Sequence, residues 1–208
     1  MKAVLFIVRK VPNELKIVLA VLATLLLLPL ISVGVMATTG IPEVSDALVS
    51  VNPTTHQVEV RNADGTIVTT INATTAWPVC GVITTEFGTP HLPFEVRHSG
   101  IDIAANGRVI GDPVTPFMEG EVIAVIDSNK GYGKHVIVSH GFGITSLYGH
   151  LSALNAATGQ RVKPGDVIGL EGSTGMSTGP HVHFETRVAG LPVNPRIFMI
   201  GNPVLCRR

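Results

Sequence analysis

The longest apolar stretch of the chain runs from Ile17 to Met36 without a charged residue. As a helix rising ~1.5 Å per residue, it reaches about 30 Å, the thickness of the hydrocarbon core of a bilayer. The preceding residues 1–16 carry four basic side chains against the single acidic Glu14. The positive-inside rule keeps such a flank in the cytoplasm. We therefore predict a single-pass membrane anchor at residues 17–36, with the rest of the chain exported.

A cleaved signal peptide is the alternative for the same segment, because Val35-Met36-Ala37 resembles the end of a cleavage site. The apolar stretch is longer than the ~7–15 residues of a usual signal-peptide core, which favours an anchor. Both interpretations export the remainder. We expect the protein at the cytoplasmic membrane, with its larger part on the periplasmic or extracellular side.

After residue 37 the pattern changes to short apolar runs between turns. Residues 37–55 contain Pro42 and Pro53 and have no clear period, which is typical of a linker. Asp64-Gly65 lies between alternating apolar positions and predicts a β-hairpin over residues 56–71. A helical period is visible only over Leu151–Ala157.

From Trp77 onward, glycine-bounded apolar runs predict short antiparallel strands. These runs are Val79–Thr85, Val122–Asp127, His135–His140, Thr145–Tyr148, Val167–Leu170 and His181–Val188. The chain contains 22 glycines and 14 prolines, which favour a turn-rich β protein over a helical bundle. We expect a mainly β domain at residues 76–200, a linker and hairpin at 37–75 before it, and a tail at 201–208.

Charge and cysteine content narrow the class of protein. The formal net charge is +0, whereas proteins that bind nucleic acids usually carry a basic excess, so no nucleic-acid partner is expected. The two cysteines, Cys80 and Cys206, lie in the part predicted to be exported, where an oxidising environment permits a disulfide. We predict a bridge between them, which requires their Cα atoms to come within ~4.4–6.8 Å.

Two short motifs supply candidate metal ligands: His98 and Asp102, four residues apart, and His181 and His183, two residues apart. Side chains at i and i+2 of a strand project from the same face, so the last two imidazoles share one wall. His98 and Asp102 can converge either across a strand or around a tight turn at Gly100. Nitrogen and oxygen ligands with an open fourth position are typical of catalytic zinc.

A series of motifs over about residues 76–200 resembles the lysostaphin-type peptidoglycan endopeptidases. The motifs are Trp77-Pro-Val, Phe87-Gly88, His98-Ser-Gly-Ile-Asp102, Gly131-Tyr-Gly-Lys134, Tyr148-Gly-His-Leu-Ser152, Val162-Lys-Pro-Gly-Asp166, Gly172-Ser-Thr-Gly175 and Gly179-Pro-His-Val-His-Phe-Glu185. The resemblance implies an antiparallel sandwich or half-barrel of the duplicated hybrid motif kind. It also implies that His98, Asp102 and His183 ligate Zn²⁺, and that His150 and His181 are catalytic histidines in the cleft.

The function implied by this resemblance is hydrolysis of peptide bonds of bacterial peptidoglycan, in cross-bridges or stem peptides, by a metal-activated water. Some members of the family have lost the site residues and act only on other cell-wall enzymes. The alternative function is therefore a non-catalytic protein that regulates other cell-wall hydrolases or bridges an envelope complex. All five site positions are filled here, which favours the enzyme, with peptidoglycan and the membrane as its partners.

Several residues near these motifs have two interpretations. Glu185 shares the face of the His-x-His pair and either orients an imidazole or is an exposed strand carboxylate. Tyr132 either lines the cleft or covers a sheet edge.

The family often has an Arg directly after the Phe-Gly pair, whereas Thr89-Pro90 stand here, so a transition-state contact from that stretch is in doubt. The remaining histidines are predicted to be ordinary strand or turn residues: His56, His91, His135 and His140.

Overall fold

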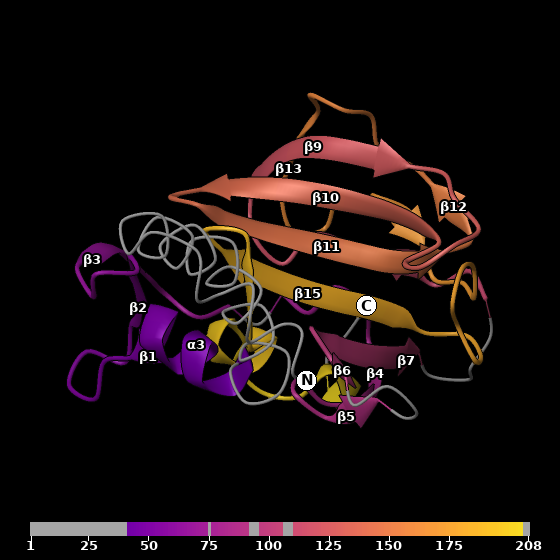
Figure 1. Ribbon diagram of the computed structural model, residues 1–208. Coiled ribbons are helices and arrows are strands. Elements are labelled where there is room, and N and C mark those ends of the chain that lie inside the picture. The colour runs from indigo at the N-terminus through magenta and orange to yellow at the C-terminus, as the bar shows by residue number, and fades with distance from the viewer. Residues whose placement is uncertain (1–40, 75, 92–95, 106–109, 206–208) are drawn as a thin grey trace, which may run out of the picture. The chain divides into compact units, whose positions relative to one another are not determined.

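The computed structural model describes residues 41–74, 76–91, 96–105 and 110–205. An eight-stranded antiparallel sheet forms the main body of the fold in these residues. Seven strands follow the order β13, β9, β10, β11, β15, β7, β4, and β16 pairs with β15 (Figure 1). Their bounds are β4 Gly81–Thr85, β7 Ile101–Ala105, β9 Gly120–Ile126, β10 Lys134–Gly141, β11 Ile144–Leu151, β13 Arg161–Val162, β15 Val182–Val188 and β16 Leu191–Val193. The mainly β, antiparallel fold expected from the sequence is confirmed.

Smaller sheets and two short 3-10 helices complete the described part. The strands β12, β14 and β8 form one three-stranded sheet, β1, β2 and β3 form another, and β5 pairs with β6. The bounds are β1 Val49–Val51, β2 Val58–Arg61, β3 Ile67–Ile71, β5 Pro90–His91, β6 Val96–Arg97, β8 Pro113–Val114, β12 Ala153–Leu154, β14 Gly169–Leu170, η1 Pro195–Phe198 and η2 Pro203–Leu205. β2 and β3 pair antiparallel within the predicted hairpin segment.

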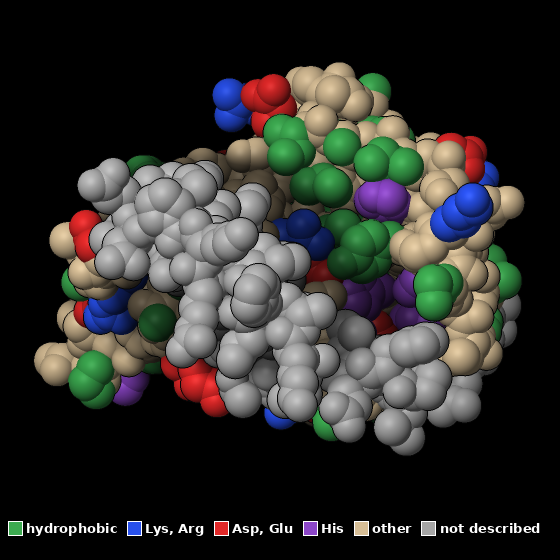
Figure 2. All heavy atoms as spheres, viewed as in Figure 1, with side chains coloured by type: hydrophobic (Ala, Val, Ile, Leu, Met, Phe, Trp, Pro, Cys, Tyr) green, Lys and Arg blue, Asp and Glu red, His purple; other side chains and the backbone are tan. Residues whose placement is uncertain are grey.

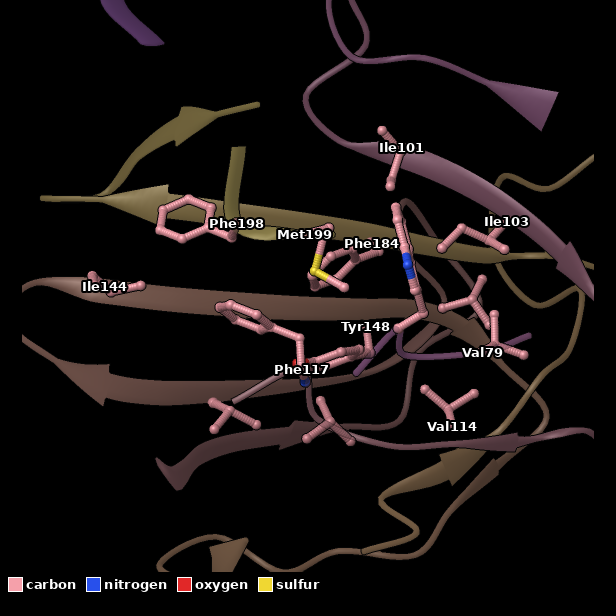
Figure 3. Close-up of a cluster of buried hydrophobic side chains, with 14 of the residues drawn as sticks. Val79, Ile101, Ile103, Val114, Phe117, Ile144, Tyr148, Phe184, Phe198 and Met199 are labelled. Atoms are coloured by element: carbon pink, nitrogen blue, oxygen red, sulfur yellow. The ribbon is translucent and has the colours of Figure 1, made fainter. Parts of the chain in front are cut away.

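The two faces of the main sheet have different side chains because strand residues alternate in direction. On one face, Tyr148 and Phe184 stack between neighbouring strands, with ring centroids 5.4 Å apart, in a cluster of fully buried side chains (Figure 3). Val182 also points into this core. The intervening residues of β15, His183 and Glu185, therefore project to the opposite face. The histidine motif is thus carried by a strand whose other side is anchored in the core.

The segment predicted to be a linker contains regular structure. Residues Ile41–Leu48 form helix α3, and β1 follows it directly (Figure 1). One side of the helix is covered, since Ser45 and Leu48 are buried while Asp46 is exposed. Ser45 Oγ accepts a hydrogen bond of 2.9 Å from the backbone N–H of Asn194. The linker prediction was wrong here because a two-turn helix is too short to give a clear period.

The helical period over Leu151–Ala157 was also misleading, because this segment contains strand β12, which pairs with β14. Two further predictions fall on residues outside the described ranges: the membrane segment at 17–36, and the disulfide partner Cys206. Within the described residues, no helix is long and apolar enough to cross a membrane. The anchor and the bridge stay predictions.

Candidate active site

The candidate metal ligands come from two neighbouring strands, β7 and β15, and from the turn that precedes β7. His98 lies in the turn between β6 and β7, and Asp102 is the second residue of β7. His183 is directly opposite Asp102 in the antiparallel pairing of β15 with β7. Residues 81 positions apart in the chain are thereby brought side by side. Figure 2 shows histidine side chains gathered in a hollow on the face in view.

Three donor atoms of this triad form a nearly equilateral triangle. His183 Nδ1 lies 2.9 Å from Asp102 Oδ1, and His98 Nε2 lies 3.1 Å from the same oxygen. The two nitrogens are 3.0 Å apart. Zinc with ~2.0–2.1 Å bonds to nitrogen and oxygen in tetrahedral geometry separates its ligand atoms by ~3.3 Å. The triangle therefore fits a zinc ion with little rearrangement.

The outer nitrogen of each imidazole in the triad faces a hydrogen-bond acceptor. His98 Nδ1 lies 3.2 Å from the backbone carbonyl oxygen of Glu86, and His183 Nε2 lies 3.4 Å from Glu185 Oε1. We assign the proton of each neutral ring to this outer nitrogen, because only a protonated nitrogen can donate to an oxygen acceptor. The inner nitrogens then direct their lone pairs at one point beside Asp102. Such a donor set needs a cation.

The electrostatics of the buried triad agree with this requirement. Burial opposes ionisation of Asp102, but hydrogen bonds that the protonated rings of His183 and His98 donate hold the pKa of the carboxyl well below its usual range. Burial also disfavours the charged form of His183, yet hydrogen bonds to Asp102 and Glu185 raise its pKa to about 9. The site thus stabilises positive charge strongly. Among the described residues, this is the only group of three potential ligands whose donor atoms meet, all within 4.8 Å.

The two predicted catalytic histidines lie beside the triad. The ring centroids of His150 and His181 are 4.8 Å apart, and His181 Nε2 is 3.7 Å from Asp102 Oδ1. The Nδ1 atoms lie 2.8 Å from backbone carbonyl oxygens, that of Thr174 for His150 and that of Gly179 for His181. Both rings therefore donate through Nδ1, which leaves Nε2 unprotonated in the neutral form. The structure brings together all five predicted site residues.

His150 reaches the site through an irregularity in β11. The pairing of β10 with β11 shifts register between Lys134 and Val136, and His150 has a positive φ of 62°. Strict alternation after the core residue Tyr148 would direct His150 into the core, so the bulge re-aims its side chain. Burial, together with the charges of His181 and His183, lowers the pKa of His150 to about 4 against a raising hydrogen bond to the Thr174 carbonyl. The imidazole is neutral at physiological pH.

A layer of polar side chains supports the triad. Glu185 is fully buried, so the interpretation as an exposed carboxylate is wrong. Tyr132 lies over the site, with its ring centroid 5.4 Å from that of His183 and its hydroxyl donating to Glu185 Oε1 at 2.8 Å. Ser99 and Arg187 also donate to Glu185. The sequence analysis did not identify Ser99 or Arg187 as site residues. The i+2 spacing of Arg187 from Glu185 could have indicated its role, whereas no sequence pattern indicated that of Ser99.

Two other histidines make ordinary contacts within the strands. His135 Nδ1 lies 2.8 Å from the carbonyl oxygen of Gly133. His140 Nδ1 lies 2.8 Å from the carbonyl oxygen of Glu119, and its Nε2 lies 2.7 Å from Ser146 Oγ. Neither belongs to the metal triad. This agrees with their prediction as strand residues.

Comparison with known proteins identifies the family. Residues 96–195 match the model of Peptidase family M23. A single-residue mutant of the catalytic domain of the prophage-encoded M23 protein EnpA from Enterococcus faecalis is 37% identical, with a TM-score of 0.51. The chain covers 88% of that structure, which covers 55% of this chain. The chain belongs to peptidase family M23. All five site residues lie in the M23 region.

Curated M23 relatives include both an enzyme and an activator by name. DD-carboxypeptidase/endopeptidase Mpg of Neisseria meningitidis serogroup B is 46% identical over 108 residues, covering 52% of this chain and 24% of the relative. Murein hydrolase activator EnvC of Escherichia coli K12 is 38% identical over 120 residues, covering 58% and 27%. The chain thus spans about a quarter of the length of these relatives. Family membership therefore leaves the activity to the site residues.

Proposed function

We propose that this M23 protein is a zinc-dependent endopeptidase that hydrolyses peptide bonds of bacterial peptidoglycan, in cross-bridges or stem peptides. The observation that carries the proposal is the complete set of site residues in one arrangement. The three inward-facing donor atoms of the triad lie within 4.8 Å of one another. Beside them lie His150 and His181, whose Nδ1 atoms contact backbone carbonyl oxygens and whose Nε2 atoms are therefore unprotonated in the neutral rings. Peptidoglycan as the substrate is supported by the name of a further relative, Peptidoglycan DD-endopeptidase ShyA of Vibrio cholerae, which is 42% identical over 98 residues.

His98, Asp102 and His183 would hold the zinc ion. When bound by three protein ligands, zinc supplies Lewis acidity to a peptide carbonyl and to water at neutral pH. The burial of the triad excludes competing water and strengthens its electrostatic interactions. The position of His98 depends on the Glu86 carbonyl, which receives the Nδ1 proton of the ring.

His150 and His181 are proposed to transfer protons. Because each donates through Nδ1 to a backbone carbonyl, Nε2 accepts a proton in the neutral ring and donates only after it has taken one. An oxyanion contact by neutral His150 is therefore disfavoured. Accepting the proton of the attacking water and passing it to the leaving amine suits such a nitrogen. His181 is the better candidate for the first step, since its Nε2 is 3.7 Å from the triad carboxylate.

A non-catalytic regulator is the alternative function, favoured by the similarity to the activator EnvC. The test is to incubate the purified full chain with peptidoglycan of several chemotypes and to identify released muropeptides by mass spectrometry. We expect new amine and carboxyl ends at one kind of peptide bond, and no release by the His150→Ala/His181→Ala double variant. If zinc-loaded wild type released nothing from any chemotype, the regulator would replace the enzyme.

We also propose that residues 17–36 anchor the protein in the cytoplasmic membrane, with the M23 region on the outer side. The charge-free stretch after a basic flank supports this proposal. An alkaline phosphatase fused to the C-terminus should be active, and the protein should remain in the membrane fraction. An N-terminus at Thr38 in membrane extracts would favour the cleaved signal peptide instead.

A further inference from the structure

Behind the metal triad, a fully buried carboxylate contacts one of the three ligands. Glu185 lies two residues after His183 on the same face of β15, and none of its surface is exposed. Its Oε1 lies 3.4 Å from His183 Nε2, the ring nitrogen on the far side from Asp102. At this distance the hydrogen bond is a weak one, so the contact acts through the charge of the carboxylate as well.

Three other side chains hold this carboxylate in place. Oε1 accepts hydrogen bonds from the hydroxyl of Tyr132, at 2.8 Å, and from that of Ser99. Oε2 accepts from Arg187 Nε at 2.6 Å, and Arg187 Nη2 also lies 3.3 Å from the Tyr132 hydroxyl. A carboxylate has about four acceptor positions, so these donors fix its orientation and its charge. Glu185 is therefore a rigid anion directed at one nitrogen of His183.

The two nitrogens of His183 face opposite carboxylates. Asp102 Oδ1 lies 2.9 Å from Nδ1 and favours the tautomer with its proton on that atom, which cannot bind a metal. Glu185 favours the proton on Nε2, which leaves the Nδ1 lone pair free. We propose that Glu185 is a positioning residue for zinc binding, which keeps the proton of His183 on Nε2. This inference rests on the proposed zinc site and adds the residue that selects the tautomer.

A purely structural role is the competing explanation, because Glu185 also forms an ion pair with the partly buried Arg187. The chain offers a matched control in β2. Glu59 pairs with Arg61 at the same i, i+2 spacing, and Glu59 is 8% exposed. Glu59→Gln therefore removes a comparable ion pair in a different sheet, without a contact to the triad.

Replacing Glu185 with glutamine keeps the shape of the side chain but turns one acceptor into a donor. If the amide nitrogen faces Arg187, two donors oppose each other. If it faces His183, it donates to Nε2 and favours the tautomer that excludes the metal. Both orientations remove the anion beside Nε2, so Glu185→Gln should weaken zinc binding.

The test measures the zinc dissociation constant of the full chain by competition with a chromophoric chelator, together with the absorption spectrum of the Co²⁺-substituted protein. Loss of such an outer partner costs ~10–100-fold in metal affinity, and we expect this for Glu185→Gln, with an altered Co²⁺ spectrum. Tyr132→Phe should weaken binding less, because Ser99 still holds Oε1. Glu59→Gln should leave both readouts unchanged, whatever it does to the unfolding midpoint.

Wild-type zinc affinity and Co²⁺ spectra in both Glu185→Gln and Tyr132→Phe would overturn the inference, even if the variants were less stable. If Glu185→Gln does not fold, Tyr132→Phe decides alone: weaker zinc binding supports the positioning role, and unchanged binding overturns it. Failure of the proposed function looks different. A wild type that binds zinc but cuts no peptidoglycan contradicts the endopeptidase, while the affinity of Glu185→Gln still decides the role of Glu185.

Discussion

Four imidazoles share the candidate site, but we expect only His98 and His183 to hold the metal. His150→Ala and His181→Ala should therefore retain zinc, because neither ring contributes to the converging donor atoms. Loss of a general acid–base group typically lowers the rate by ~10²–10⁴, so each variant should lose at least about two decades of peptidoglycan hydrolysis. Zinc content, a melting curve and hydrolysis of each variant provide the measurement.

The matched control for this prediction is His98→Ala, which should lose both zinc and activity. Combining the two catalytic substitutions need not multiply their effects, since residues that act as a unit are strongly non-additive. Stoichiometric zinc in His98→Ala, or near wild-type hydrolysis by both His150→Ala and His181→Ala, would contradict the assignment of roles.

His140 should make stability depend on pH. Burial lowers its pKa in the folded protein to about 4, against a raising hydrogen bond to the Glu119 carbonyl, whereas the unfolded value is ~6.5. Between these values the unfolded chain binds more protons, so the free energy of unfolding falls as the pH falls. The loss is about 2 kcal/mol at pH 5 relative to pH 7.5 and is complete below pH 4.

Urea unfolding of wild type and His140→Gln at pH 7.5 and pH 5 tests this prediction. Glutamine does not titrate, so the variant should lose less stability than wild type on acidification. Equal losses in the two proteins would assign the acid sensitivity to other groups.

At the scale of single residues, the sequence predicted the site histidines better than the polar side chains that hold them in place. The five site residues occupy recognisable motifs, whereas the role of Ser99 depends on β15 lying behind the turn that carries it. Even the direction of His150 could not be read from alternation, because a bulge and a positive φ turn its side chain. Such features depend on pairing between strands, which local sequence does not encode.

At the scale of elements, Gly100 controls how closely β7 approaches β15. A Cβ on Gly100 would lie 2.3 Å from the carbonyl oxygen of Phe184, so the glycine is needed for close packing. Gly100→Ala should push β7 away from β15 and separate Asp102 from His183. We expect a loss of ~1–3 kcal/mol in the free energy of unfolding, together with weaker zinc binding.

Denaturant unfolding and chelator competition measure the two effects of Gly100→Ala. Gly179→Ala is the control for stability, because a Cβ there meets nothing within 4 Å. If Gly100→Ala were as stable as wild type, the close approach of the two strands would not constrain this position.

The longer strands were predictable, and most of the two-residue strands and helix α3 were not. β9, β10, β11 and β15 coincide closely with apolar runs in the sequence, because each strand is long enough to contain several apolar residues between its turns. Strands of two residues, such as β5 and β12, are too short to show any period. Helix α3 has only eight residues and begins with Ile41-Pro42, a combination that resembles a loop.

At the scale of the whole molecule, helix α3 and the sheet of β1, β2 and β3 belong to the same core as the M23 region. The side chains of Leu48, Val49, Val58 and Val60 are buried in one cluster with Phe198. The residue spacing of the motifs did not predict this, because contacts between distant segments follow from the fold. Residues 41–74 thus contribute to the core of the M23 region and are more than a spacer before it.

A fragment of residues 76–208 should therefore be much less stable than one of residues 41–208. Burying an aliphatic side chain contributes ~1.5–3 kcal/mol, and a domain has only ~5–15 kcal/mol in total. The melting temperature of the shorter fragment should be at least ~10 °C lower, since a loss of 1 kcal/mol in the free energy of unfolding lowers the melting temperature by ~2–8 °C in domains of this size range. Ser45→Ala in the longer fragment should cost ~1–3 kcal/mol, because the partly buried N–H of Asn194 loses its acceptor. Thermal unfolding by circular dichroism compares the three proteins, and equal midpoints for the two fragments would restore the view of residues 41–75 as a spacer.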